Sequence, residues 1–252
     1  KRLRDNYVFR EKLFNIDYNN VNSTELVSLD ITLKNTCNLS CRICEPIASS
    51  KWMSEASQHP ASYPQWQPVN NIKIEWTDNT DSNLWKDINE IGDNLRYITF
   101  SGGEPLLDKS HVYMLEYLVS NNRSSQISLH YNTNGTVYAE HLILLWDKFK
   151  QVELSFSIDN IESKFEYERY GSTWDKVIKN INRYKKLNSD IYKFNVYRVV
   201  TALNILDSYE VFQFCKNIKL PVAFDILDIP NELNIGLFNK KQKNYISTKL
   251  LS

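Results

Sequence analysis

The chain has 252 residues, 42% of them hydrophobic, which is enough to bury the core of one large domain or of two small ones. Its 30 basic and 30 acidic residues give a net charge of 0, which argues against nonspecific nucleic-acid binding as the main activity. No apolar run approaches the ~18 residues of a membrane span, and no signal peptide is visible, so we expect no membrane association.

The first half of the chain mixes short regular elements with loops. Alternating apolar and polar residues predict a strand over residues 26–33. A cysteine-rich loop follows, and then a short helix over residues 49–56 that one of its first serines would cap. Residues 57–81 contain three prolines and are expected to form a long loop, which in a compact domain is usually functional or mobile. A helix is predicted over residues 84–91.

From residue 97 onward, strands and helices alternate regularly. Short apolar runs predict strands over residues 97–100, 127–131, 152–158, 194–201 and 222–227. Helical periodicity predicts helices over residues 110–120, 139–149, 172–187 and 207–218. With the first strand, this makes six strand-then-helix units, the last incomplete, and such alternation indicates a parallel sheet with right-handed crossovers. Six units are too few for a closed eight-unit barrel, so we expect an α/β fold of the (βα)6 type, a curved, TIM-like partial barrel.

These elements divide the chain into three parts. Residues 25–229 are expected to form the core domain. Because the chain starts with Lys rather than Met, we interpret residues 1–24 as an N-terminal extension left from a longer N-terminal region. Residues 230–252 are expected to be a C-terminal tail, too short and without the cysteines needed for a cluster-binding domain.

Unusual residues follow four consecutive strands. They are the cysteine loop after the first strand, Gly102-Gly103-Glu104-Pro105 after the second, Asn132 and Asn134 after the third, and Ser157 and Asp159 at the end of the fourth. In α/β folds of this kind, ligands bind at the carboxyl ends of the strands. Each motif taken singly is compatible with a structural turn, but their coincidence with the cysteines predicts one shared site.

The cysteine loop holds Cys37, Cys41 and Cys44 at a C-x3-C-x2-C spacing. In a chain with few other cysteines, this pattern indicates a metal site in a reducing compartment, so we expect a cytoplasmic protein. Three thiolates are one short of the usual four-cysteine set of a four-iron cluster, which leaves a position open for a small molecule. The alternatives are three unmodified thiols or a zinc site completed by His59. Zinc sites usually pair two C-x2-C motifs, and only Cys41 and Cys44 fit one.

Together, the cysteine triplet and the Gly-Gly-Glu-Pro turn resemble the radical S-adenosylmethionine (radical SAM) superfamily, over about residues 26–227. The fold of that superfamily is a (βα)6 partial barrel. The resemblance implies that the cysteines bind three irons of a [4Fe–4S] cluster and that the fourth iron binds the amino nitrogen and carboxylate of S-adenosylmethionine (SAM). SAM would then be cleaved reductively to methionine and a 5′-deoxyadenosyl radical, which abstracts hydrogen from a substrate. The implied partner is an electron donor such as flavodoxin or ferredoxin.

The resemblance also implies which residues contact SAM. They are Ile43, Gly102, Gly103, Glu104, Asn132, Asn134, Ser157, Asp159 and Arg169. The glycine-rich turn would approach closely and hold the ammonium, the asparagines and the end of the fourth strand would meet the ribose or the carboxylate, and the arginine would pair with the carboxylate. Strand-end turns and a surface salt bridge are the structural alternatives. Ile43 departs from the family, which often has an aromatic residue there against the adenine.

Further segments resemble the twitch/SPASM-like subgroup, whose members modify peptides and proteins. They are the run from Cys44 to Trp52, the run from Ser157 to Ile161, and the run from Tyr170 to Lys176. We therefore expect a peptide or protein substrate first and a nucleotide-like small molecule second, and no general acid or base stands out. An auxiliary cluster would have to lie in an N-terminal part outside the chain. The alternative from another class is a catalytically inactive member that serves as a metal-binding or docking module.

Two further groups of residues lie outside these motifs. Cys215 lies among apolar residues of a predicted helix and is expected to be a buried free thiol. Four tryptophans lie in or near the long loop, where they would line a substrate face or pack under the loop: Trp52, Trp66, Trp76 and Trp85.

Overall fold

The centre of the fold is a six-stranded sheet with the order β1-β2-β3-β4-β5-β6, in which all neighbouring strands are parallel. The computed structural model describes residues 26–32, 34–64, 94–187 and 190–251. The strands are β1 (Ser28–Thr32), β2 (Tyr97–Ser101), β3 (Ser128–Thr133), β4 (Gln151–Ser157), β5 (Tyr192–Val200) and β6 (Val222–Ile226). All six predicted strands are confirmed, with ends that differ by one or two residues.

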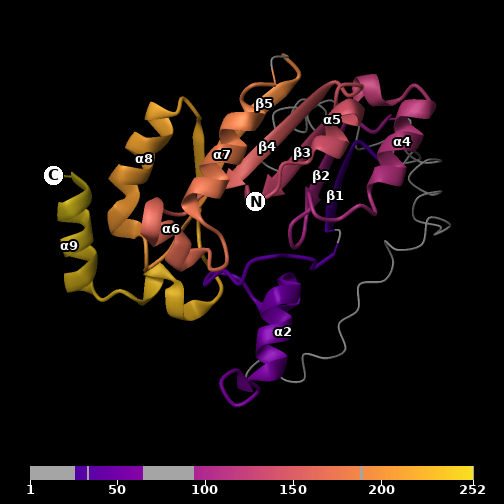
Figure 1. Ribbon diagram of the computed structural model, residues 1–252. Helices are drawn as coiled ribbons and strands as arrows, with labels where there is room; N and C mark the ends of the chain where they lie inside the picture. Colours follow the sequence, from indigo (N-terminus) through magenta and orange to yellow (C-terminus); the bar gives the residue numbers. More distant parts are fainter. Residues whose placement is uncertain (1–25, 33, 65–93, 188–189, 252) are drawn as a thin grey trace, which may run out of the picture.

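Helices connect the strands and cover the sheet. They are α2 (Ser50–Gln58), α4 (Val112–Ser120), α5 (Glu140–Trp146), α6 (Glu162–Glu168), α7 (Trp174–Tyr184), α8 (Ser208–Asn217) and α9 (Lys240–Leu251). Figure 1 shows α4, α5, α7 and α8 along the sheet, while α2 stands away from it and is joined to β1 by the cysteine loop. The predicted helix over residues 84–91 and most of the predicted loop over residues 57–81 lie outside the described residues. None of the described helices is long and apolar enough to cross a membrane.

The sequence did not predict α6 and α9. Each buries little apolar surface: Phe165 is the buried apolar residue of α6, and Ile246 that of α9. A helix with one buried apolar residue lacks the repeating stripe by which a helix is found in a sequence. The strand order confirms the expected α/β partial barrel, because β1 and β6 are the two ends of the sheet and do not pair with each other among the described residues.

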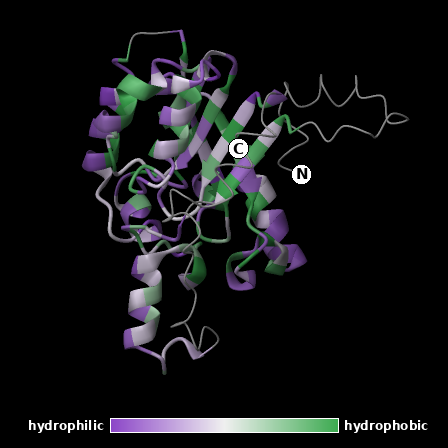
Figure 2. Cartoon of the chain, turned by 90° about the vertical axis from the view of Figure 1, so that its right-hand side faces the viewer, coloured by the Kyte–Doolittle hydropathy of each residue, from purple (hydrophilic) through white to green (hydrophobic). Residues whose placement is uncertain are grey.

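The core lies between the sheet and the helices, and the strand residues that face it are apolar (Figure 2). An aromatic cluster forms its centre. The rings of Phe100 and Tyr131 stack with their centroids 4.8 Å apart, and the fully buried Trp146 donates a hydrogen bond from Nε1 to the Tyr131 hydroxyl at 3.2 Å. These contacts join β2, β3 and α5 and thereby fix the strand ends that carry the predicted site.

His111 is packed inside this cluster. Its ring is 0% exposed and lies 4.7 Å from the Phe100 ring and 5.7 Å from the Tyr131 ring, measured between centroids. Burial lowers the pKa of His111 to about 4, although nearby Asp108 acts in the opposite direction. The native state therefore keeps this imidazole neutral at a pH where the unfolded chain binds a proton.

We expect the free energy of unfolding to fall as the pH drops from about 6.5 to about 4, and the His111 contribution to reach about 3 kcal/mol. The sign follows because the unfolded state binds more protons in this window. Urea unfolding of the wild type and of His111→Phe near pH 7 and near pH 4.5 measures it. His130, whose pKa burial also lowers to about 4, is present in both proteins and cancels. An equal loss of stability in the two proteins would contradict the assignment to His111.

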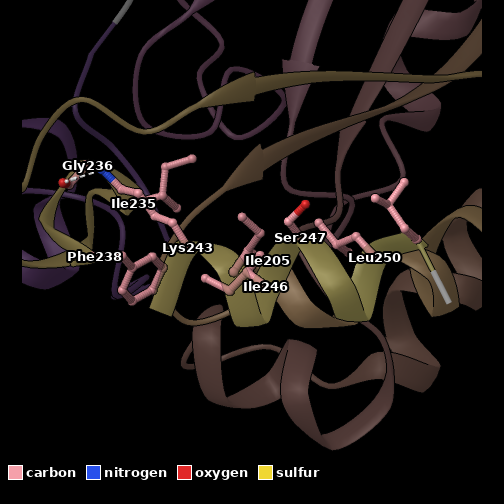
Figure 3. Close-up of a pocket in the computed structure, with 9 residues that line it drawn as sticks. Ile205, Ile235, Gly236, Phe238, Lys243, Ile246, Ser247 and Leu250 are labelled. Atoms are coloured by element: carbon pink, nitrogen blue, oxygen red, sulfur yellow. Dashed lines mark hydrogen bonds between the residues drawn. The ribbon is translucent and has the colours of Figure 1, made fainter. Parts of the chain in front are cut away.

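The C-terminal helix α9 forms one wall of an apolar pocket. Its volume is about 590 Å³, and Figure 3 shows Ile205, Phe238, Ile246 and Leu250 around it. None of the residues that line it belongs to the predicted site. The candidate functional site is therefore at the cysteine loop and not at this pocket.

Candidate functional site

The cysteine loop lies directly over the glycine-rich turn that follows β2. The backbone N–H of Gly103 donates to the carbonyl of Lys34 at 2.8 Å, and the N–H of Glu104 donates to the carbonyl of Thr36 at 2.8 Å. These two bonds join the turn to the segment that leads into Cys37. The predicted meeting of motifs at the carboxyl ends of the strands is confirmed for β1 and β2.

Both glycines of the turn are required by the backbone. Gly102 has a φ of 116°, which residues with a side chain rarely adopt. At Gly103, a Cβ atom would lie 2.3 Å from the carbonyl oxygen of Thr36, well inside van der Waals contact. The glycines thus allow the turn and the cysteine loop to touch. Their predicted contact with the ammonium of SAM stays a prediction.

Glu104 links the ends of β2 and β3. Its side chain is buried, and its carboxylate accepts hydrogen bonds from Leu106 N at 3.1 Å, from Thr133 Oγ1 at 2.8 Å and from Asn134 N at 2.6 Å. Burial raises the pKa of Glu104 to about 7, while these hydrogen bonds act in the opposite direction. The carboxylate is therefore engaged within the protein, which leaves the backbone of the turn as the better placed group for a ligand.

A small amide network connects the turn after β3 to the cysteine loop. Asn134 Nδ2 donates to Asn38 Oδ1 at 3.1 Å and approaches Cys37 Sγ at 3.9 Å. Asn38 Nδ2 donates to Thr136 Oγ1 at 2.9 Å. The predicted residue Asn134 is thus at the site, but it holds the loop. The sequence analysis missed Asn38 and Thr136. Asn132, also predicted, is half-buried at the end of β3.

The first turn of α2 holds the loop from the other side. Ser49 Oγ donates to the carbonyl of Leu39 at 2.6 Å and caps the helix by accepting from Trp52 N. Ser50 Oγ accepts from Cys37 N at 3.1 Å. Trp52 Nε1 donates to the carbonyl of Cys41 at 2.7 Å. Trp52 therefore positions the loop, a role that the sequence analysis did not assign to it.

The segment that ends α6 lies alongside Cys41. The N–H of Ser40 donates to the carbonyl of Tyr170 at 2.9 Å, and the N–H of Arg42 donates to the carbonyl of Glu168 at 2.8 Å. Cys41 lies between the two donor residues, and Arg169 lies between the two acceptor residues. The unpredicted helix α6 therefore brings Arg169 opposite the second cysteine.

Arg169 and Asp159 form a buried ion pair. Arg169 Nη2 lies 2.7 Å from Asp159 Oδ2, and their side chains are 9% and 0% exposed. Asp159 Oδ1 also accepts a hydrogen bond from Val199 N at 2.9 Å. The structural alternative of a surface salt bridge is wrong for Arg169, because the pair is buried. The predicted contacts of both residues with SAM stay predictions. Ser157 is half-buried at the end of β4.

A second buried arginine supports this pair from β5. Arg198 is 1% exposed, and its Nε donates to the carbonyl of Asp159 at 3.0 Å. Its Nη2 donates to the carbonyl of Asn204 at 2.6 Å. The side chain of Asn204 in turn donates to Glu168 Oε2 at 2.8 Å. An arginine between the apolar pairs Val196-Tyr197 and Val199-Val200 was the available signal, and the sequence analysis missed it.

The thiols of the loop form a chemically coherent set. Cys41 is buried, and Cys37 and Cys44 are half-buried. Burial raises the pKa of all three, that of Cys41 to about 12, and neighbouring thiols raise the pKa of Cys41 and of Cys44 further. Arg169 acts in the opposite direction on Cys41 and Cys44. Thiolates at this place therefore need positive charge beside them, and iron ions bound to the sulfurs provide it, so the donor set fits an iron–sulfur cluster.

The zinc alternative would require His59 to lie at the cysteine loop. Among the described residues, no three Cys, His, Asp or Glu side chains are grouped to hold a single metal ion. His59 is exposed at the C-terminal end of α2, whereas the first turn of that helix contacts the loop. An iron–sulfur cluster does not require the three sulfurs to meet at one ion, because each cysteine binds its own iron.

Ile43, between the second and third cysteines, is half-buried beside them. Cys215 is 1% exposed in α8, which confirms a buried free thiol.

The chain is similar to a protein family and to solved structures. A family model described as "Radical SAM superfamily" matches residues 31–205. The structure of anSMEcpe with bound AdoMet is similar, with a TM-score of 0.60 and 22% identity over 90% of this chain and 58% of that one. SuiB from Streptococcus suis bound to precursor peptide SuiA has a TM-score of 0.59 and 15% identity, over 97% of this chain and 50% of that one. The chain thus spans less than two thirds of either protein. No curated protein matches it significantly.

Proposed function

The chain belongs to the radical SAM superfamily, and we propose from this that Cys37, Cys41 and Cys44 hold a [4Fe–4S] cluster with one iron open to SAM. When bound, these cofactors supply the chemistry of the family, in which SAM is cleaved reductively to methionine and a 5′-deoxyadenosyl radical that abstracts hydrogen from a substrate. The observation that carries the proposal is the contact between the cysteine loop and the glycine-rich turn, through Gly103 N and Glu104 N.

The residues of this chain provide the binding site and its rigidity. We propose that the backbone of Gly102 and Gly103 holds the ammonium of SAM, since the Glu104 carboxylate is already hydrogen-bonded. Asn132 and Ser157 are half-buried at neighbouring strand ends and are proposed to meet the ribose. The apolar side chain of Ile43 is proposed to cover the adenine. Contacts of Asn134, Asp159 and Arg169 with SAM are proposed as well, and the Nε atom of Arg169 makes no hydrogen bond within the described part of the chain.

Reconstitution tests the catalytic claim directly. The protein is loaded with iron and sulfide under anaerobic conditions, reduced, and supplied with SAM, and 5′-deoxyadenosine is measured. We expect a [4Fe–4S] spectrum and formation of 5′-deoxyadenosine. A full [4Fe–4S] spectrum without this product would contradict the activity and favour the inactive docking module. Zinc without iron would contradict the cluster as well.

A peptide is the substrate that we propose first. It is supported by two neighbours in fold, whose structures were solved as anSMEcpe with bound AdoMet and a peptide and as SuiB bound to precursor peptide SuiA. The sequence runs that resemble the twitch/SPASM-like subgroup point the same way. We further propose residues 25–229 as the core, a flavodoxin- or ferredoxin-like electron donor as partner, and the cytoplasm as location, because the thiolates need a reducing compartment.

The Trp52 hydrogen bond is expected to matter for retention of the cluster. Trp52→Phe removes the donor to the carbonyl of Cys41 and should cost about 1 kcal/mol, or about a fivefold faster loss of iron to a chelator. The measurement is the half-time of iron release under anaerobic conditions. Tyr63→Phe is the control, because Tyr63 packs on the Trp52 ring and its hydroxyl donates a hydrogen bond to Glu55 Oε1 at 3.1 Å. Equal half-times for Trp52→Phe and the wild type would contradict this role.

A further inference from the structure

The position of Arg169 is fixed by the backbone around it. Hydrogen bonds from Ser40 and Arg42 to the segment Glu168–Tyr170 flank both Cys41 and Arg169. These two bonds place Arg169 opposite Cys41, which is one of the three ligands of the proposed cluster.

Its partner is fixed equally well. Asp159 receives a hydrogen bond from Val199 N at 2.9 Å on one carboxylate oxygen, and Arg198 donates to its backbone carbonyl at 3.0 Å. The other carboxylate oxygen lies 2.7 Å from Arg169 Nη2. The Nε atom of Arg169 is buried and makes no hydrogen bond within the described part of the chain. Asp159 is thus held in place by groups of β5.

Because the two charges are buried, water screens them less than it screens exposed charges. Water screens exposed charges strongly, whereas charges away from water interact several times more strongly at the same distance. The pair is almost completely buried. The ion pair between Lys164 of α6 and Asp207, which precedes α8, offers a comparison, because the Lys164 side chain is 59% exposed.

We propose that Arg169 and Asp159 set the reduction potential of the cluster, Arg169 raising it and Asp159 limiting the rise. The proposal rests on the proposed function, because it requires a cluster on the cysteine loop. Reduction adds one negative charge to the cluster, and a buried guanidinium beside the cysteine loop stabilises that charge. A buried carboxylate next to the guanidinium acts in the opposite direction. Arg169 and Asp159 would thus act on the reaction through the reduction potential of the cluster.

Opposite shifts of the midpoint potential test the proposal. The reconstituted protein is titrated with reductant in the absence of SAM, and the reduced cluster is followed by EPR. Arg169→Gln should lower the potential by at least the equivalent of a tenfold change in the reduction equilibrium, 59 mV for one electron. Asp159→Asn keeps an acceptor for Val199 N and should raise the potential. Arg169→Lys keeps the charge and should stay near the wild type, and the exposed-charge control Lys164→Gln should not shift.

The outcomes separate this inference from the function on which it rests. A wild-type protein that takes up no [4Fe–4S] cluster would overturn the proposed function. An intact cluster whose potential shifts in the same direction in Arg169→Gln and Asp159→Asn, or in neither, would overturn only the electrostatic role. If Arg169→Gln fails to hold a cluster, the rise in Asp159→Asn decides, since a purely structural pair gives no reason for the potential to rise.

Discussion

Replacing Cys37, Cys41 and Cys44 with alanine, singly or together, is expected to abolish the visible iron–sulfur absorption and the formation of 5′-deoxyadenosine. Each thiolate is proposed to hold a different iron, so the loss of any one leaves an iron without its protein ligand. The measurements are iron content, the absorption spectrum after anaerobic reconstitution, and product formation with reductant and SAM.

The fourth cysteine provides the matched control. Cys215 is buried in α8, where burial raises its pKa to about 11, and it belongs to the core cluster instead of the loop. Cys215→Ala should lower the free energy of unfolding by about 1 kcal/mol, as a small cavity does, and leave the iron content unchanged. Absorption that persists in the triple alanine variant would show that the ligand assignment is wrong.

Replacing Gly103 with alanine is expected to have the second largest effect. The added Cβ would lie 2.3 Å from the carbonyl oxygen of Thr36. The Gly103 backbone and the Thr36 carbonyl are both held in place by hydrogen bonds. The turn and the cysteine loop must therefore separate, at a cost of about 3 kcal/mol or more. We expect a lower free energy of unfolding in urea for the metal-free protein and a strong loss of iron after reconstitution.

A glycine away from the site distinguishes this effect from a general response to alanine. At Gly236, a Cβ would meet Asn234 Oδ1 at 2.8 Å, but this oxygen is the end of a flexible side chain and can move. Gly236→Ala should therefore leave iron binding unchanged. If Gly103→Ala bound iron like the wild type, the close contact between the turn and the loop would not be what positions the cysteines.

The fold could be predicted because its signals are local. Alternating apolar residues mark the first strand, short apolar runs mark the other strands, and apolar residues at helical spacing mark α4, α7 and α8. The order of elements therefore follows from the sequence and implies a parallel sheet. The rim then follows from geometry, since parallel strands place their carboxyl ends together. The same signals failed for α6 and α9, whose polar sequences hold one buried apolar residue each.

The side-chain partners at the site could not be predicted in this way. Arg169 and Asp159 looked like two separate ligand contacts, and the structure places them 2.7 Å apart. Trp52 looked like a residue of a substrate face or of packing under the loop, and the structure gives its indole N–H to the carbonyl of Cys41. These contacts depend on how helices α2 and α6 lie against the loop, which no local pattern reveals.

The sequence by itself determined the cysteine spacing, the glycine-rich turn and the strand-by-strand order, and these define the family and the proposed cluster ligands. Only the tertiary structure decided which polar groups remain for a cofactor and which are used within the protein. Glu104 binds groups of β3 some thirty residues away, and Asp159 binds Val199 on β5. The physical reason is that a buried charge must find its partners wherever the fold places them, whatever their distance along the chain.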